Sequence, residues 1–272
     1  MKVSGKVFIV TGAGGGIGSA LVKQLLQRGA KVLATDRDET LLAELKKECG
    51  QLGPLETQVA DISAETTADM LLNTAVKKLS SVDGIIHCAG IIQPFKEASS
   101  LPLADANRVM NINFFGTLYL IRSLVPYLKN RPEAHIVNVS SMGGFLPVPG
   151  QGVYGASKAA VKLLSESLYA ELINSSVKVS IVFPGATNTN ITKNSGVKTS
   201  VAANEKSSPV PMLSAEKAAS QIIKGVEKNK LYIYTGADSK TMNILYRLFP
   251  KFATRFIAKQ MKDIFSILAY NR

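Results

Sequence analysis

The chain has 272 residues, of which 46% are hydrophobic, and a formal net charge of +12. Gly and Pro are not in excess, so we expect one large globular domain with a substantial core. The two cysteines, Cys49 and Cys88, are too few for a disulfide framework and lack metal-ligand spacing. This predicts no metal site and a reducing, cytoplasmic setting. The uncharged stretch from Val139 to Ser157 contains five Gly and two Pro, which excludes a membrane-spanning helix there.

Short apolar runs alternate with longer helical patterns over most of the chain. Strands are expected at residues 6–12, 31–36, 55–61, 82–90, 134–141, 177–185 and 231–236. Helices are expected at residues 15–30, 39–49, 65–79, 103–128 and 153–174. Apolar strands that alternate with helices predict an α/β fold with a parallel sheet covered on both faces.

Two segments depart from this alternation. Residues 190–213 are polar and rich in Ser, Thr and Asn, as a mobile lid would be. Residues 241–272 hold six basic residues and one acidic residue, so the positive charge is concentrated at the end of the chain. We therefore expect a single domain over residues 1–240, which includes the lid, and a C-terminal helical tail over residues 241–272.

A glycine turn follows the first expected strand directly and opens the first expected helix. Its sequence, TGAGGGIG, spans Thr11 to Gly18. Glycines in this place let the backbone approach a pyrophosphate, and the helix N-terminus offers free N–H groups. The strand before and the helix after favour a dinucleotide site over a purely structural turn. The residues expected to contact the cofactor here are Gly12, Gly14, Gly16, Ile17 and Gly18.

Asp36 ends the second expected strand, about 20 residues beyond the glycine turn. Its carboxylate would accept hydrogen bonds from adenosine ribose hydroxyls and repel a 2′-phosphate, so Asp36 favours NAD over NADP. Arg37 follows immediately and would stack on adenine or hold a phosphate, which keeps NADP open. The alternative for this stretch is a solvated helix start with Asp38 as its cap.

The stretch GVYGASKAAV places Tyr154 four residues before Lys158 in an expected helix. At this spacing both side chains lie on one face of the helix. The pair is either ordinary helix surface or a phenol whose acidity the ammonium group tunes. A free phenol has a pKa near ~10 and is a poor base at neutral pH, and a nearby positive charge lowers that pKa.

Taken together, these motifs resemble the short-chain dehydrogenase/reductase family over about residues 6–235. The resemblance implies a Rossmann-type doubly wound parallel sheet of about seven strands. VADIS, HCAG, NINFFG, NVSS, YGASK and FPGATNT follow the glycine turn in the order of the family's motifs. The further cofactor contacts that it implies are Asp61, Ile62, Ala89, Gly90, Tyr154, Lys158, Pro184, Gly185, Thr187 and Thr189, with Thr189 preferred over Thr187 for the nicotinamide carboxamide.

The resemblance also implies a catalytic set of Asn113, Ser141, Tyr154 and Lys158. Tyr154 would exchange a proton with the substrate oxygen, and Ser141 would hold that oxygen. Lys158 would lower the pKa of Tyr154 and bind the nicotinamide ribose, and Asn113 would anchor a water that links Lys158 to solvent.

Two choices within this set depend on spacing. The family places its serine 13 positions before the tyrosine, which selects Ser141 over Ser140. The N-x-x-G element is matched through Asn113 rather than Asn111. One departure is Cys88, which stands where the family usually has asparagine. We expect Cys88 and the preceding histidine to be structural rather than catalytic.

The implied function is an NAD(P)-dependent oxidoreductase that interconverts a secondary alcohol and a ketone. The runs FLPVP and PMLS are apolar, which favours a lipid-, steroid- or retinoid-like substrate, although they would equally form core or an oligomer interface. The family pairs through its long helices, which implies a homodimer or homotetramer. The alternative function is a non-catalytic dinucleotide-binding sensor or scaffold. The residues expected at the substrate are Gln93, Ser141, Met142 and Tyr154, with Ile91, Ile92 and residues 143–148 nearby.

The tail combines positive charge with apolar residues. A basic residue recurs every four positions at Arg247, Lys251, Arg255 and Lys259, and Pro250 should interrupt or start a helix. A basic amphipathic helix lies in a membrane interface, or it packs on its own domain or on a partner subunit. No nucleic-acid motif accompanies the charge, so no nucleic-acid partner is expected. The apolar residues of the tail are Leu248, Phe252, Phe256, Ile257, Ile264, Phe265 and Leu268.

Overall fold

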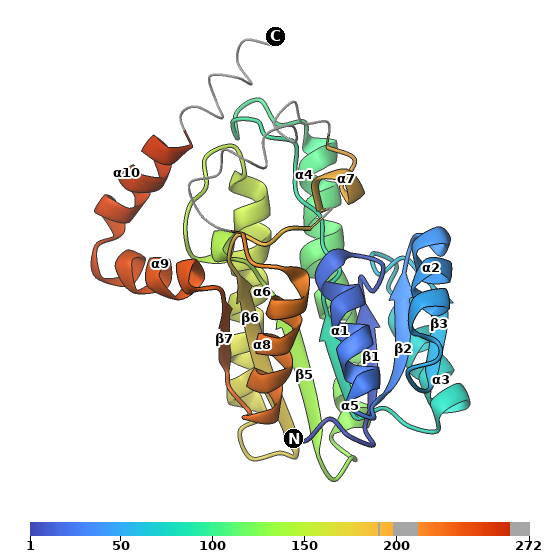
Figure 1. Cartoon of the computed structure of the whole chain (residues 1–272). Coiled ribbons are helices and arrows are strands. Elements are labelled where there is room, and N and C mark those ends of the chain that lie inside the picture. Colours follow the sequence, from blue (N-terminus) through green and yellow to red (C-terminus); the bar gives the residue numbers. More distant parts are fainter. Residues whose placement is uncertain (190, 198–211, 262–272) are drawn as a thin grey trace.

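Seven parallel strands form one twisted sheet in the order β3-β2-β1-β4-β5-β6-β7 (Figure 1). The computed structural model describes residues 1–189, 191–197 and 212–261. The strands are β1 (Val7–Thr11), β2 (Lys31–Asp36), β3 (Leu55–Val59), β4 (Gly84–His87), β5 (Ala134–Val139), β6 (Val177–Pro184) and β7 (Tyr232–Thr235). This confirms the predicted Rossmann-type sheet. The strand order reverses between β1 and β4, and ligands of such sheets bind outside the carboxyl ends of the strands at this point.

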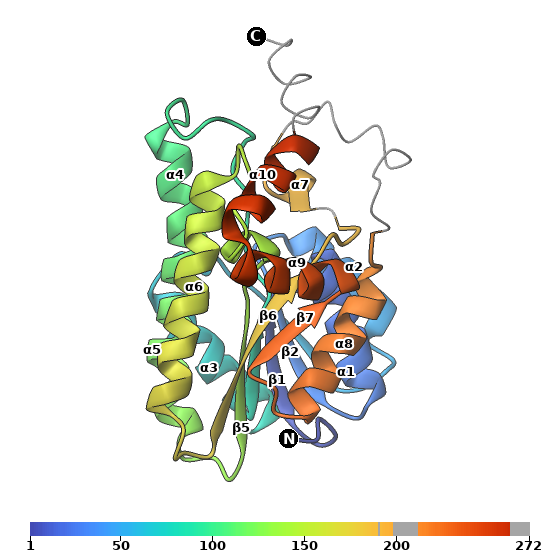
Figure 2. The same cartoon turned by 90° about the vertical axis from the view of Figure 1, so that its left-hand side faces the viewer.

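Helices cover both faces of the sheet, which explains why the central strands are almost entirely buried (Figure 2). One face packs against α1 (Gly16–Gln27), α2 (Glu39–Cys49) and α8 (Ala215–Glu227). The other packs against α3 (Thr66–Leu79), α5 (Gly116–Leu128) and α6 (Gly152–Glu171). Each face therefore has its own apolar core, and the strands contribute side chains alternately to the two.

The prediction of a single helix over residues 103–128 is wrong in one respect, because a π-helical turn interrupts the helix. The segment consists of α4 (Leu103–Met110), the π turn η1 (Asn111–Phe115) and α5. A π turn inserts an extra residue into the helix, and such turns are frequent at functional sites. Here the turn buries Asn113 completely and leaves Asn111 exposed. This agrees with the choice of Asn113 over Asn111.

Two short helices follow strands near the carboxyl edge of the sheet, namely the 3-10 turn η2 (Met142–Gly144) and α7 (Ile191–Asn194). After β7 the chain forms α9 (Ala237–Leu248) and α10 (Pro250–Gln260), so Pro250 starts a helix. Most of the expected lid and the tail residues Ile264, Phe265 and Leu268 lie outside the described residues. None of the helices described is both long enough and apolar enough to cross a membrane.

Candidate functional site

A groove opens where β1, β2 and β4 end. The predicted cofactor residues that line it are Gly12, Gly16, Ile17, Gly18, Asp36, Arg37, Asp61, Ile62, Ala89, Gly90 and Thr189. Its other lining residues are Gly15, Thr35, Ala60, Cys88, Ile91, Ile112, Val139, Ile191 and Asn194.

The glycine turn is shaped by close backbone contacts that only glycine permits. Gly12 has a φ of +65°, and a Cβ there would lie 2.7 Å from the main-chain nitrogen of Ala89. A Cβ on Gly18 would overlap the carbonyl oxygen of Gly12. The N-cap of α1, Gly15, has no side chain to bond the first N–H groups of the helix. The turn therefore leaves these groups free for a pyrophosphate, as the dinucleotide hypothesis requires.

Asp36 lies at the end of β2, with one side-chain oxygen toward the glycine turn. Its Oδ2 accepts a hydrogen bond of 3.0 Å from the main-chain nitrogen of Gly14. Asp38 caps α2 by accepting hydrogen bonds from two main-chain nitrogens, so the helix-cap alternative holds for Asp38 and not for Asp36. Arg37 donates a hydrogen bond of 2.7 Å from Nη2 to the carbonyl oxygen of Asn194. That contact holds α7 at the rim of the groove.

Six of the expected cofactor residues do not line the groove, namely Gly14, Tyr154, Lys158, Pro184, Gly185 and Thr187. Gly185 packs against the carboxylate of Asp238, which accepts a hydrogen bond of 2.7 Å from the main-chain nitrogen of Ala186. Thr187 pairs through a β-bridge with Leu213. Since Thr189 lines the groove next to Gly16, the preference for Thr189 over Thr187 agrees with the geometry.

The four expected catalytic residues come from three segments that meet near the end of β4. Tyr154 and Lys158 lie on α6, Ser141 follows β5, and Asn113 lies in the π turn. A Cβ on Gly90 would lie 2.9 Å from Lys158 Nζ and 3.2 Å from Asn113 Oδ1, so the glycine of HCAG makes room for both side chains.

Asn113 and Lys158 are held by main-chain groups. The Oδ1 of Asn113 accepts a hydrogen bond of 2.9 Å from the main-chain nitrogen of Ile91, and its Nδ2 donates to the Ile91 carbonyl at 3.0 Å and to Ser157 Oγ at 2.9 Å. Lys158 is 4% exposed, and its Nζ donates a hydrogen bond of 2.9 Å to the carbonyl oxygen of Val139. Both side chains are therefore fixed in orientation within the site.

The two serines after β5 face in different directions. Ser140 is buried, and its Oγ donates a hydrogen bond of 2.7 Å to the carbonyl oxygen of Lys158. Ser141 is partly exposed and forms a side-chain hydrogen bond with Tyr154. This arrangement agrees with the choice of Ser141, because Ser140 is occupied in holding α6 against the sheet.

The pKa values of Tyr154 and Lys158 differ from the expectation for this pair. Burial raises the pKa of the Tyr154 phenol, and the hydrogen bond with Ser141 offsets part of that increase. Burial also lowers the pKa of Lys158, to about 8. The prediction that Lys158 lowers the pKa of Tyr154 is therefore wrong for the protein alone, because removal of the phenol from water dominates.

Burial moves the pKa values of both Cys88 and His87 away from neutral pH. The Cys88 thiol lines the groove, but burial raises its pKa to about 12. Burial and the nearby charge of Lys158 lower the pKa of His87 to about 3, and its Nδ1 shares a hydrogen bond of 2.6 Å with Thr11 Oγ1. Both findings agree with the structural roles expected for these two residues.

Gln93 differs from its expected place at the substrate. Its side chain is fully buried; Nε2 donates to the carbonyl oxygen of Gly150, and Oε1 accepts from the main-chain nitrogen of Tyr154, both at 2.9 Å. Its own carbonyl oxygen accepts a hydrogen bond of 2.9 Å from Gln151 Nε2. Gln93 therefore positions the start of α6 and the loop before it. Met142 is partly exposed in η2, directly after Ser141.

Several groove residues were not predicted from the sequence. Thr35, Cys88 and Val139 each lie at or near the carboxyl end of a strand. Because ligands of such sheets bind at these ends, their positions in the sequence could have indicated them. Asn194 carries no such signal, because only packing of α7 brings it to Arg37.

Comparison with known proteins agrees with this geometry. A family model described as short chain dehydrogenase matches residues 6–219. The 1-deoxy-11-beta-hydroxypentalenate dehydrogenase of Streptomyces avermitilis is 31% identical over 245 residues, which cover 89% of this chain and 88% of that protein.

Two crystal structures have the same fold. One, a short chain dehydrogenase/reductase from Burkholderia phymatum in complex with NAD, gives a TM-score of 0.81 at 26% identity and covers 91% of this chain and 96% of its own. The other is a short chain dehydrogenase from Burkholderia cenocepacia in complex with NADP. It gives a TM-score of 0.77 at 27% identity, and the match covers 94% of this chain and 99% of its own. The family model, the fold and the groove lead to one conclusion: the chain belongs to the short chain dehydrogenase family of oxidoreductases.

Proposed function

We propose that the protein is an NAD(P)-dependent oxidoreductase that interconverts a secondary alcohol and a ketone. The proposal rests on one observation, the meeting of Tyr154, Ser141, Lys158 and Asn113 beside a groove built on a glycine turn. A non-catalytic sensor needs the groove but does not need a buried lysine and a serine–tyrosine hydrogen bond beside it.

The residues present fit a dinucleotide. The glycine turn and the N-terminus of α1 would hold its pyrophosphate, and Asp36 and Asp61 would bind its adenosine half. The bound nicotinamide supplies or accepts the hydride. Thr189 would hold the carboxamide at the other end of the groove.

Tyr154 would exchange the proton that accompanies the hydride. Because burial keeps its phenol protonated, Tyr154 is ready to donate a proton to a ketone oxygen that Ser141 also holds. In the reverse direction the ammonium group of Lys158 would stabilise the phenolate that accepts the proton. Asn113, fixed by three hydrogen bonds, would anchor the water through which Lys158 regains its proton.

Replacing Tyr154 with Phe tests the catalytic role, because it removes only the hydroxyl group. We expect turnover of alcohols, followed at the nicotinamide absorbance, to fall by roughly 10²–10⁴-fold while cofactor affinity stays unchanged. Unchanged turnover in the variant would disprove the role of Tyr154. Cofactor binding without turnover of any alcohol or ketone by the wild-type protein would favour the sensor.

We further propose that NAD is the preferred cofactor. Asp36 lines the groove, and the guanidinium group of Arg37 is engaged by Asn194 rather than free to pair with a 2′-phosphate. Asp36→Ala should raise the ratio of kcat/KM for NADP to that for NAD by about tenfold or more, since it removes a like charge from the phosphate. A wild-type preference for NADP would refute this.

The substrate is proposed to be hydrophobic. Ile91, Ile112 and Val139 line the groove near the catalytic residues, and the Streptomyces relative is named for a hydroxypentalenate. A homo-oligomer formed through the long helices is also proposed, because α6 exposes Leu163 and Tyr169. Light scattering in solution would measure its mass, and a monomer would contradict it.

A further inference from the structure

The helices α9 and α10 extend from the β7 edge of the sheet and present an exposed apolar surface (Figure 1). Leu248 is 66% exposed and Phe252 is 59% exposed, whereas Ala253 is the only buried residue of α10. Packing on its own domain, one of the alternatives for the tail, therefore leaves these side chains uncovered by the described part of the chain. We define the tail surface as Ile244, Arg247, Leu248, Phe249, Lys251, Phe252, Arg255, Phe256 and Lys259.

Aromatic and basic side chains share one face of α10. At 100° per residue, Lys251, Arg255, Lys259, Phe252 and Phe256 lie within an arc of about 140°. The rings of Phe252 and Phe256 stack with their centroids 6.4 Å apart. No acidic residue occurs in α10. This face therefore offers apolar rings flanked by cations.

We propose that the tail surface binds the surface of an anionic lipid bilayer. An interfacial helix buries its apolar side chains at the boundary of headgroups and acyl chains, while its cations meet anionic headgroups. A second copy of the chain is a poorer occupant, because two tail surfaces would oppose cation to cation.

The position of the tail surface connects it to the catalytic site. The helix α9 packs against η2, which directly follows Ser141. A bilayer bound at α9 and α10 would therefore lie near Met142 and the residues after it, where the substrate is expected. This link rests on the proposed function and extends it, since a hydrophobic alcohol would then pass from lipid to the groove.

Sedimentation of the full chain with vesicles tests the proposal. One set of vesicles is phosphatidylcholine alone, and the other is phosphatidylcholine mixed with phosphatidylglycerol. Two double variants change the tail surface, Phe252→Ser with Phe256→Ser and Lys251→Glu with Arg255→Glu. Because each basic residue near an anionic surface strengthens binding by about fivefold, the charge-reversal variant should lose at least about tenfold of the partition coefficient. The phenylalanine variant removes the rings that would enter the bilayer, so its partition coefficient should also fall by at least about tenfold.

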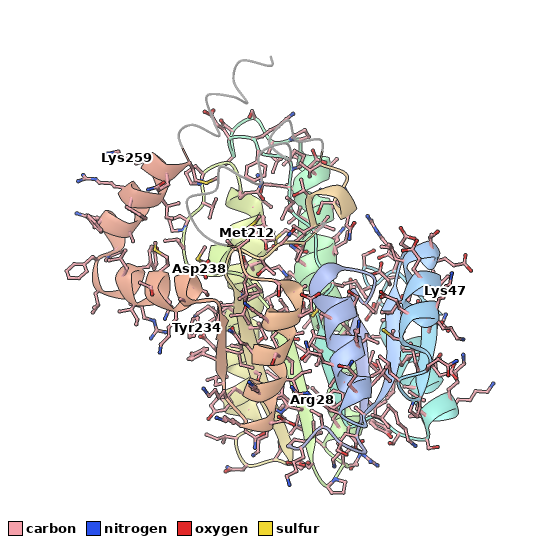
Figure 3. The ribbon with its side chains drawn as sticks, in the orientation of Figure 1. Arg28, Lys47, Met212, Tyr234, Asp238 and Lys259 are labelled. Carbon is pink, nitrogen blue, oxygen red and sulfur yellow. The ribbon has the colours of Figure 1, made fainter. Side chains whose placement is uncertain are left out.

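Matched controls change similar side chains elsewhere. Leu103→Ser removes a side chain that is 79% exposed on α4. Lys46→Glu with Lys47→Glu reverses two exposed charges on α2, and Figure 3 shows Lys47 on the opposite side of the molecule from Lys259. Both controls should bind the mixed vesicles within about twofold of the wild-type protein.

Three results would overturn the proposal. These are no sedimentation of the wild-type protein with the mixed vesicles, equal binding to both kinds of vesicle, and unchanged binding of both tail variants. If the phenylalanine variant instead lowers the mass measured by light scattering, the surface is an interface between copies. Turnover of a water-soluble alcohol and cofactor affinity are measured for every variant, so failure of the proposed function is recorded separately from failure to bind lipid.

Discussion

Lys158 is the buried charge on which the proposed chemistry depends, and it should reduce the stability of the fold. Burial lowers its pKa from 10.5 to about 8. At about 1.36 kcal/mol per pKa unit, a protonated Lys158 costs the folded state about 3 kcal/mol at neutral pH. Between these two pKa values the unfolded chain binds a proton that the folded protein lacks. The stability of the wild-type protein should therefore rise as the pH rises through this window. Below about pH 8, Lys158 is protonated in the folded state as well, and the full cost of burying its charge applies.

Replacing Lys158 with Met isolates this effect, because it removes the titrating group and keeps most of the volume. The unfolding free energy of the wild-type protein minus that of Lys158→Met should increase by about 2 kcal/mol between about pH 7 and 9.5. The variant also leaves the carbonyl oxygen of Val139 without its lysine donor. This loss costs about 1–3 kcal/mol, but it does not depend on pH. The test is therefore how the difference in unfolding free energy changes with pH, and not its absolute size.

Urea unfolding followed by far-UV circular dichroism at a series of pH values measures the slope. The chain has no tryptophan, so circular dichroism is preferable to intrinsic tryptophan fluorescence. Lys47→Met, at an exposed position, is the control and should give a difference that does not change with pH. Parallel curves for the wild-type protein and Lys158→Met would refute the reasoning, since they would mean that burial does not perturb this lysine.

Two further substitutions test the support of the site. Gln93→Ala should lower kcat by at least about tenfold and leave cofactor affinity, measured by titration, unchanged, because it removes the acceptor that holds the main-chain nitrogen of Tyr154. An equal loss of cofactor affinity would contradict this positioning role. Gly18→Ala should weaken cofactor binding by at least about tenfold, because its Cβ overlaps the carbonyl oxygen of Gly12. Gly152→Ala, whose Cβ would have its nearest neighbour at 3.9 Å, should change neither cofactor affinity nor thermal stability, and a similar loss in both variants would show that the glycine turn is not special.

The local pattern of the chain determined the sheet and the turn that opens the groove. Strands such as β1 are continuous apolar runs, and a run of this kind is stable only when helices cover both of its faces. The glycine turn was predictable because a glycine is required wherever backbone meets backbone, as at Gly12 and Ala89. The resemblance to the family selected Ser141 by its spacing from Tyr154, and strand geometry agrees, since only one of two successive side chains can face the site.

Tertiary structure alone decided which polar groups remain free and how acidic they are. Arg37 and Asn194 are 157 positions apart, and Gln93 and Tyr154 are 61 apart, so no local pattern indicates that they pair. The π turn that buries Asn113 packs against α6, and no local pattern in the sequence indicated this turn. The pKa of Tyr154 rises because distant segments exclude water from its ring. Burial and long-range hydrogen bonding arise only when the chain is folded, and for that reason the sequence indicated the residues of the site but not their electrostatic state.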